Sequence, residues 1–166
     1  MASMRARSSS GNSLSIRMSE EDSRIDHAPR SKTPGIYFDP DAYAKSVPRL
    51  FDHLRNKLGF GIEFIHDVHE RVTPVTAIHL AKTLEQYQLF YLEDPVAPEN
   101  IDWLKMLRQQ ASTPISMGEL FVNVNEWKPL IDNKLIDFIR CHVSTIGGIT
   151  PAKKLAVYSE LNGVRT

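Results

Sequence analysis

Three acidic residues hold matching places in the sequence, each at the end of a short run of mostly apolar residues. They are Asp67, Glu93 and Glu119, and their separations are equal, since 93 − 67 = 26 and 119 − 93 = 26. This regular spacing predicts one carboxylate in each of three repeated structural units. The simpler alternative is that each acid merely caps a strand in solvent, but that alternative does not require equal spacing.

Carboxylates that meet at one place repel one another and raise each other's pKa unless a cation compensates them. A hard divalent cation turns such a cluster into a set of oxygen ligands. Mg²⁺ suits the cluster because it accepts a few carboxylates and keeps positions for water or substrate oxygens. We therefore predict that Asp67, Glu93 and Glu119 bind Mg²⁺.

Two histidines lie next to the first of these acids. His69 follows Asp67 by two residues, so in an extended segment both side chains point to the same side. Histidine has an ordinary pKa suited to proton transfer near neutral pH, which makes His69 a candidate acid/base group. His66 has the opposite parity and is expected to pack or cap. A zinc site on this pair is less favoured, because the other converging groups are carboxylates.

Arg140 ends a fourth apolar run. His142 follows it by two residues, so both side chains are expected to point to the same side, at the carboxyl end of the strands. Arg140 could bind the carboxylate of a substrate, or it could pair with Glu119 or Asp67 and only balance charge. The sequence leaves these two alternatives open.

Alternating strands and helices must position these residues. Strands are predicted over 62–67, 89–93, 115–119 and 135–140, with the start of another at 164–166; helices are predicted over 39–58, 73–86, 101–110, 127–133 and 150–162. Pro129 is expected in the first turn of its helix, where proline is tolerated. Because parallel connections need long crossovers, the alternation predicts an α/β fold with a parallel sheet. A barrel and an open doubly wound sheet both fit.

Composition excludes several classes of protein. The chain has 166 residues, of which 20 are basic and 20 acidic, so it lacks the charge excess that nucleic acids or membrane surfaces attract. No apolar run reaches the roughly 18 residues of a membrane-spanning helix. The single cysteine, Cys141, cannot form an internal disulfide, which is typical of a cytoplasmic protein.

Residues 1–36 are rich in serine and arginine and show no sustained apolar periodicity. We predict a flexible segment or loop there and a folded domain over 37–166. Acidic residues follow the basic start closely and no apolar stretch accompanies it, so a targeting peptide is not expected.

The assembled motifs resemble the enolase superfamily, and within it the mannonate and galactonate dehydratases that act on acid sugars. The resemblance covers about residues 30–166 and depends on four ordered motifs: 66–71, 91–94, 118–121, and 139–142 with 147–150. It implies an enolase-type (β/α) barrel, of which this sequence holds only the central βα units.

The resemblance implies a Mg²⁺-dependent lyase of carbohydrate acid catabolism. A base removes the proton α to the substrate carboxylate, Mg²⁺ stabilises the enediolate, and loss of water gives a 2-keto-3-deoxy sugar acid. It implies that His69 is the acid/base and that Arg140 is a catalytic residue close to metal and substrate, with Arg140 and His142 binding the substrate. A sugar acid is the expected small-molecule partner, the cytoplasm the expected location and a homo-oligomer a possible state.

Parts of the family pattern have no counterpart here, among them a histidine after the seventh strand, a glutamate after the eighth and an upstream tyrosine–arginine pair. We therefore expect the dehydratase to be incomplete, and inactive as this chain. The alternative is a non-catalytic fragment of a truncated gene that at most binds a divalent metal or a complementary chain. A complete open α/β hydrolase is a third hypothesis, but no nucleophile ends a predicted strand.

Overall fold

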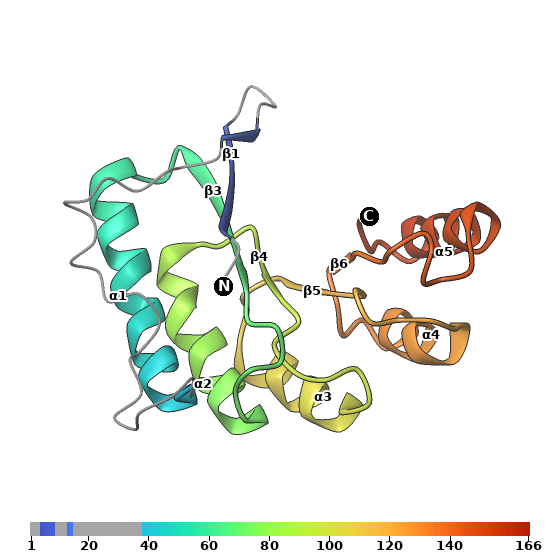
Figure 1. Ribbon diagram of the computed structural model, residues 1–166, viewed down its shortest axis with the longest axis horizontal. Helices are drawn as coiled ribbons and strands as arrows, with labels where there is room; N and C mark the ends of the chain where they lie inside the picture. The colour runs from blue at the N-terminus through green and yellow to red at the C-terminus, as the bar shows by residue number, and fades with distance from the viewer. Residues whose placement is uncertain (1–3, 9–12, 15–37) are drawn as a thin grey trace.

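The computed structural model describes residues 4–8, 13–14 and 38–166 (Figure 1). It contains a six-stranded sheet in the order β2-β1-β3-β4-β5-β6. Four of these strands are parallel and are neighbours in chain order: β3 (Ile62–Asp67), β4 (Tyr91–Glu93), β5 (Ile115–Met117) and β6 (Phe138–Ile139). The predicted α/β class with a parallel sheet is confirmed.

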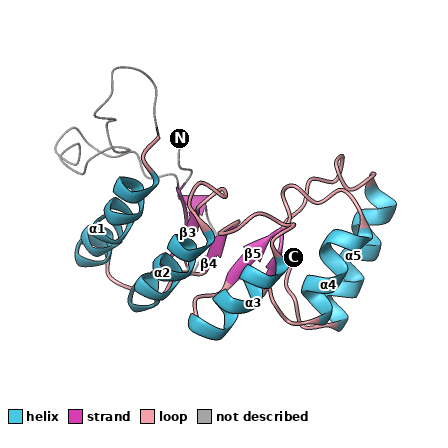
Figure 2. Cartoon of the chain, turned by 90° about the horizontal axis from the view of Figure 1, so that it is seen from below, coloured by secondary structure: helices cyan, strands magenta, loops and turns pink. Residues whose placement is uncertain are grey.

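The five α-helices among the described residues lie side by side along one side of the sheet and form an arc around it (Figures 1 and 2). They are α1 (Pro40–Leu58), α2 (Pro74–Leu84), α3 (Ile101–Gln110), α4 (Val124–Asp132) and α5 (Ile149–Leu161), and a 3-10 turn, η2 (Glu85–Tyr87), extends α2. Helices on a single side of strands that follow one another in order are typical of a barrel, so the sheet is part of a barrel rather than a doubly wound sheet. None of the described helices is long and apolar enough to cross a membrane.

Local capping chemistry explains where two of the helices begin. The Asp39 carboxylate accepts hydrogen bonds from the backbone N–H groups of Asp41 and Ala42, at 3.0 and 3.1 Å. The Thr73 hydroxyl accepts one from the Thr76 N–H at 3.3 Å, and Pro74 follows as the first helical residue. These caps satisfy backbone donors that a helix cannot pair internally, so both predicted starts hold to within one residue.

Helix α4 begins earlier than predicted because a capping box, rather than its proline, sets the start. The Asn123 side chain accepts a hydrogen bond from the Asn125 N–H at 2.8 Å, and the Glu126 carboxylate accepts one from the Asn123 N–H at 3.2 Å. Pro129 therefore lies inside the helix and not in its first turn. The helix forgoes one backbone hydrogen bond at this proline.

Part of the segment predicted to be a flexible loop is strand. Strand β1 (Met4–Ser8) pairs antiparallel with residues 62–66 of β3, and β2 (Ser13–Leu14) pairs with β1. An edge strand offers unpaired backbone groups that another strand can satisfy without a marked side-chain pattern, so apolar periodicity did not reveal this pairing. The other residues of that segment, 1–3, 9–12 and 15–36, lie outside the described part of the chain. At the opposite edge Arg165 forms a single parallel bridge with Phe138, as expected for the start of a further strand.

The main core fills the space between the helices and the sheet. Its fully buried side chains come from both layers and include Phe51, Phe64, Leu92, Leu104, Leu107, Ile115, Leu130 and Leu155. On the other face of the sheet, the rings of Tyr91 and Phe138 lie 4.9 Å apart, and the Arg165 guanidinium lies 4.8 Å from the Phe138 ring. Burial of both faces holds the strand ends in place, and those ends carry the predicted functional residues.

Candidate active site at the carboxyl ends of the strands

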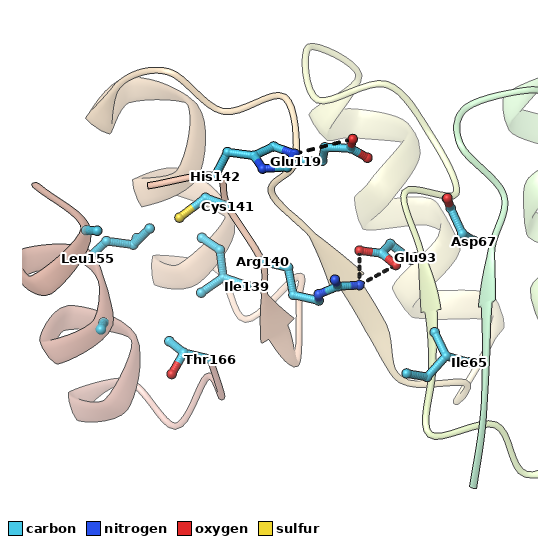
Figure 3. A pocket seen from close by; sticks show the side chains of 12 residues that line it. Ile65, Asp67, Glu93, Glu119, Ile139, Arg140, Cys141, His142, Leu155 and Thr166 are labelled. Atoms are coloured by element: carbon cyan, nitrogen blue, oxygen red, sulfur yellow. Dashed lines mark hydrogen bonds and ion pairs between the residues drawn. The ribbon is translucent and has the colours of Figure 1, made fainter. Parts of the chain in front are cut away.

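A cavity of about 510 Å³ lies at the carboxyl ends of β3, β4 and β5 (Figure 3). All three predicted carboxylates, Asp67, Glu93 and Glu119, line it. Arg140 and His142 line the same cavity, and its apolar wall comes from residues such as Ile65, Ile139, Ala152 and Leu155. Side chains that are far apart in sequence therefore line one cavity.

Asp67 and Glu93 come together through strand register, whereas Glu119 arrives by a different route. Asp67 pairs with Glu93 across β3 and β4, and Glu93 pairs with Ser116 across β4 and β5. The β5 residue on the same side of the sheet as Glu93 is therefore Ser116. Glu119 reaches the cavity because the chain leaves β5 at Gly118.

Gly118 is required where the chain leaves β5. Its φ of +141° is a conformation that residues with side chains rarely adopt, and a Cβ atom built there would lie 2.5 Å from the carbonyl oxygen of Arg140. The backbone of β6 therefore passes directly against this glycine. The same close approach positions both the Glu119 turn and the end of the strand that carries Arg140.

Arg140 forms an ion pair with Glu93 inside the cavity (Figure 3). A single guanidinium nitrogen, Nη1, lies 2.6 Å from both carboxylate oxygens of Glu93. The Glu93 side chain is 11% exposed and the Arg140 side chain 40% exposed. The sequence suggested Glu119 or Asp67 as the acid that pairs with Arg140, but neither forms this ion pair. The carboxylate that needs the counter-charge most is the buried one, because a buried charge without a partner is strongly unfavourable.

Both predicted histidines lie next to the carboxylates. Nδ1 of His69 is 3.3 Å from Asp67 Oδ2 and 3.6 Å from Glu119 Oε2, and Nε2 of His142 is 3.5 Å from Glu119 Oε1. The segment around His69 is not extended, since His69 and Glu70 have φ angles of 55° and 57°. A left-handed turn, rather than strand parity, brings His69 to Asp67.

His66 occupies the other side of β3, as its parity predicted. Its Nε2 atom lies 2.8 Å from the hydroxyl oxygen of Tyr43 in α1. Burial lowers the pKa of His66 to about 4. Because His66 and His69 do not face the same space, they do not form the zinc pair considered from sequence.

Asp94 is a buried acid at this site to which the sequence analysis assigned no role. It is 4% exposed, and burial, together with the charges of Glu93, Asp67 and Glu70, raises its pKa to about 7. A hydrogen bond from the Gly118 N–H opposes part of that rise. The consecutive acids Glu93 and Asp94 at a strand end were the available signal, because only one of two adjacent side chains can face the cavity.

The donors around the cavity fit a hard divalent cation in their chemistry. Three carboxylates line it, and Oδ1 of Asp67 is buried with no hydrogen-bond partner among the described residues. Within residues 4–8, 13–14 and 38–166, however, no three His, Cys, Asp or Glu side chains are arranged closely enough to hold a metal ion. In this arrangement Arg140 takes both oxygens of Glu93. The donor set suits Mg²⁺, but a bound ion requires the carboxylates and Arg140 to shift.

Curated proteins match this chain in sequence. A D-galactonate dehydratase family member of Salmonella virchow (strain SL491) is 96% identical over 139 residues, which are 84% of this chain and 33% of that protein. A D-mannonate dehydratase of Caulobacter vibrioides is 45% identical over 124 residues, 75% of this chain and 31% of its own length. The chain thus spans about a third of the length of these curated relatives.

A solved structure and a family model agree with these relatives. The crystal structure of an enolase from Pantoea ananatis with bound D-gluconate and Mg has a TM-score of 0.78 and 80% identity, over 85% of this chain and 34% of that one. The model of the family described as Enolase C-terminal domain-like matches residues 34–166. Both confirm the predicted enolase-type barrel, of which this chain forms a part. The chain belongs to the enolase C-terminal domain-like family, and its relatives include proteins named as D-galactonate and D-mannonate dehydratases.

Proposed function

We propose that this chain is the central barrel segment of a Mg²⁺-dependent acid-sugar dehydratase, a hydro-lyase. The observation that carries the proposal is that carboxylates at the carboxyl ends of three consecutive parallel strands line one cavity together with Arg140. The names of the relatives and the D-gluconate and Mg bound by the Pantoea ananatis protein support it. The substrate class is therefore a small sugar acid.

Asp67, Glu93 and Glu119 are the residues that would hold Mg²⁺. When bound, the ion would supply positive charge that favours developing negative charge on the substrate carboxylate. Arg140 carries N–H donors into the cavity and would bind a substrate carboxylate, and His142 would bind a substrate hydroxyl. The remaining lining of the cavity is largely apolar, so these polar groups would orient the acid end of the sugar.

His69 is the group to which we assign proton transfer. Dehydration removes the proton α to the carboxylate and breaks the C–O bond at the β carbon, so that one water leaves and the enol becomes a ketone. Nδ1 of His69 is directed at Asp67 and Glu119, which leaves Nε2 to exchange a proton with the substrate. Neutral His69 would accept the α proton, and the imidazolium so formed can donate it to the departing hydroxyl.

This chain spans about a third of the length of its curated relatives, so the proposal has two parts. Metal binding is proposed for the 166-residue chain, and the full reaction for the longer proteins that contain this segment. A second candidate function for the chain is binding of a complementary chain. It is favoured by the outer edge of β6, where Arg165 alone bridges to Phe138 among the described residues.

Titration of the purified chain with Mg²⁺, followed by calorimetry and by thermal melting, tests the metal site. A cation that binds only the folded chain raises its melting temperature as occupancy rises. Glu119→Gln should weaken binding at least as much as loss of an outer-shell metal partner does, which is roughly 10- to 100-fold. Glu160→Gln is the matched control, because Glu160 is exposed on α5 and does not line the cavity. Equal Mg²⁺ affinity in the two variants would refute the assignment.

If the chain binds Mg²⁺, the longer protein that contains it can be incubated with D-gluconate, D-mannonate and D-galactonate. We expect a 2-keto-3-deoxy acid from the preferred substrate when the chain is supplied within the longer protein. His69→Asn should abolish product formation while leaving Mg²⁺ affinity within about threefold, because His69 is not among the oxygen ligands.

A further inference from the structure

The contact between Arg140 and Glu93 places a cation where the proposed metal would need a ligand. Both oxygens of Glu93 are 2.6 Å from the same nitrogen, so Arg140 Nη1 lies between them in the way a bound cation would (Figure 3). Among the described residues that line the cavity, Arg140 is the only lysine or arginine. The strongest positive charge in the cavity is therefore already committed to one of the three predicted ligands.

The surroundings of Glu93 explain why a counter-charge is needed. Glu93 and Asp94 are both buried, and Asp67 is the register neighbour of Glu93. Three carboxyl groups in so small a space repel one another, and a buried carboxylate needs a close positive partner. Arg140 supplies this partner from the end of β6, which β5 separates from β4. Its guanidinium also lies 6.0 Å from the Tyr91 ring, which lines its approach to Glu93.

We infer that Arg140 is a built-in counter-cation for Glu93, and that it must release this carboxylate when a divalent cation binds in the cavity. The inference rests on the proposed metal site. Arg140 Nη1 contacts both oxygens of Glu93, so neither oxygen is left to a metal ion unless the guanidinium moves, and the two positive charges repel at such short distances. The ion and the guanidinium therefore compete. Once released, the guanidinium remains in the cavity and is available to a substrate carboxylate. The metal is therefore expected to bind before the sugar acid.

If Arg140 competes with the metal ion for Glu93, removing Arg140 should strengthen metal binding. If Arg140 only supported the site, its removal would not do so. Arg140→Gln removes the competitor, so the variant should bind Mg²⁺ and Mn²⁺ about tenfold more tightly than the unmodified chain. Arg140→Lys keeps a positive charge and should give an intermediate affinity. Arg108→Gln is the matched control, because Arg108 also forms an ion pair, with Asp137 at 2.9 Å, but does not line the cavity. It should leave metal affinity unchanged.

The measurement is the dissociation constant for Mg²⁺ alone by calorimetry and for Mn²⁺ alone by electron paramagnetic resonance. Circular dichroism melts of each variant show whether it remains folded. A second readout follows the ¹⁵N signals of the arginine side chains during the Mg²⁺ titration. The Arg140 Nε–H signal should shift with metal occupancy, and the Arg108 signal should not.

The outcomes separate this inference from the proposed function. Tighter binding by Arg140→Gln supports the inference, and so does binding by this variant when the unmodified chain does not bind. Equal or weaker binding by a folded Arg140→Gln, or by Arg140→Lys if the first variant does not fold, overturns the inference but leaves the metal site standing. If neither the unmodified chain nor any Arg140 variant binds metal, both the inference and the proposed metal site are wrong.

Discussion

Nε2 of His66 lies 2.8 Å from the hydroxyl oxygen of Tyr43, and this contact joins β3 to α1 on the side of the sheet opposite the cavity. His66 is 3% exposed and Tyr43 is 7% exposed, and their rings are stacked with centroids 5.9 Å apart. The residue next to His66 is Asp67, a predicted metal ligand. The buried pair therefore fixes the strand from which that ligand projects.

The buried state of His66 makes stability depend on pH. Its pKa is about 4 in the folded chain and 6.5 in the unfolded chain. Between these values the unfolded chain binds more protons, so lowering the pH from about 6.5 to about 4 should reduce the free energy of unfolding, by about 3 kcal/mol in total. Urea denaturation across this range, with His66→Gln as comparison, measures this contribution. A variant with the same pH dependence as the unmodified chain would contradict it.

Asp94 acts in the opposite direction. Its pKa is raised from 3.8 to about 7 on folding, so the folded chain binds the extra proton. This contribution to stability is fully present below about pH 3.8 and is lost as the pH rises to about 7; it amounts to about 4 kcal/mol at most. Asp94→Asn should be more stable than the unmodified chain at pH 8, with EDTA present to exclude metal ions. A variant that is less stable at pH 8 would show that the Asp94 charge is compensated.

Arg55 binds four backbone carbonyl groups at the opposite end of the strands. Its Nε donates to the Tyr87 oxygen, Nη1 to those of Gly59 and Ile62, and Nη2 to that of Gln88, at distances of 2.7–3.0 Å. Arg55→Met should lower the free energy of unfolding by about 2 kcal/mol, because the buried carbonyl of Tyr87 and three part-buried carbonyls lose their donors.

Two further variants calibrate that effect. Arg55→Lys should recover only part of the loss, because one ammonium group cannot reach four acceptors. Arg49→Met removes an exposed arginine of the same helix and should change stability by less than about 0.5 kcal/mol. If urea denaturation gave Arg55→Met and Arg49→Met the same free energy of unfolding, the prediction would be contradicted.

Gly118 should tolerate no side chain. Gly118→Ala places a methyl group against the carbonyl oxygen of Arg140 at an unfavourable φ, so we expect a loss of at least about 2 kcal/mol. Mg²⁺ affinity should also fall, because the Glu119 turn and Arg140 both move. Gly61→Ala is the matched control, since a Cβ atom there meets nothing within 4 Å. Equal melting temperatures for the two variants would show that the backbone adjusts without cost.

Much of the fold could be predicted from sequence because its signals are local. The Asp39 and Thr73 caps begin α1 and α2 where they were expected, and the apolar runs of β3 and β4 lie within the predicted strands. Capping depends on side chains within three residues of a helix start, so it can be read from the sequence. Pairing of β1 with the edge of β3 depends on backbone groups distant in sequence, and no local pattern announced it.

The sequence by itself determined that three carboxylates recur every 26 residues in a parallel α/β fold, because that pattern requires only residue types and spacing. The tertiary structure decided how they meet. Register pairs Asp67 with Glu93, whereas the positive φ of Gly118 ends the strand alternation and turns Glu119 into the cavity. It also decided that Arg140 binds Glu93 and that Asp94 is buried beside them. Ion pairs and burial depend on distances across neighbouring strands, which no spacing along one strand specifies.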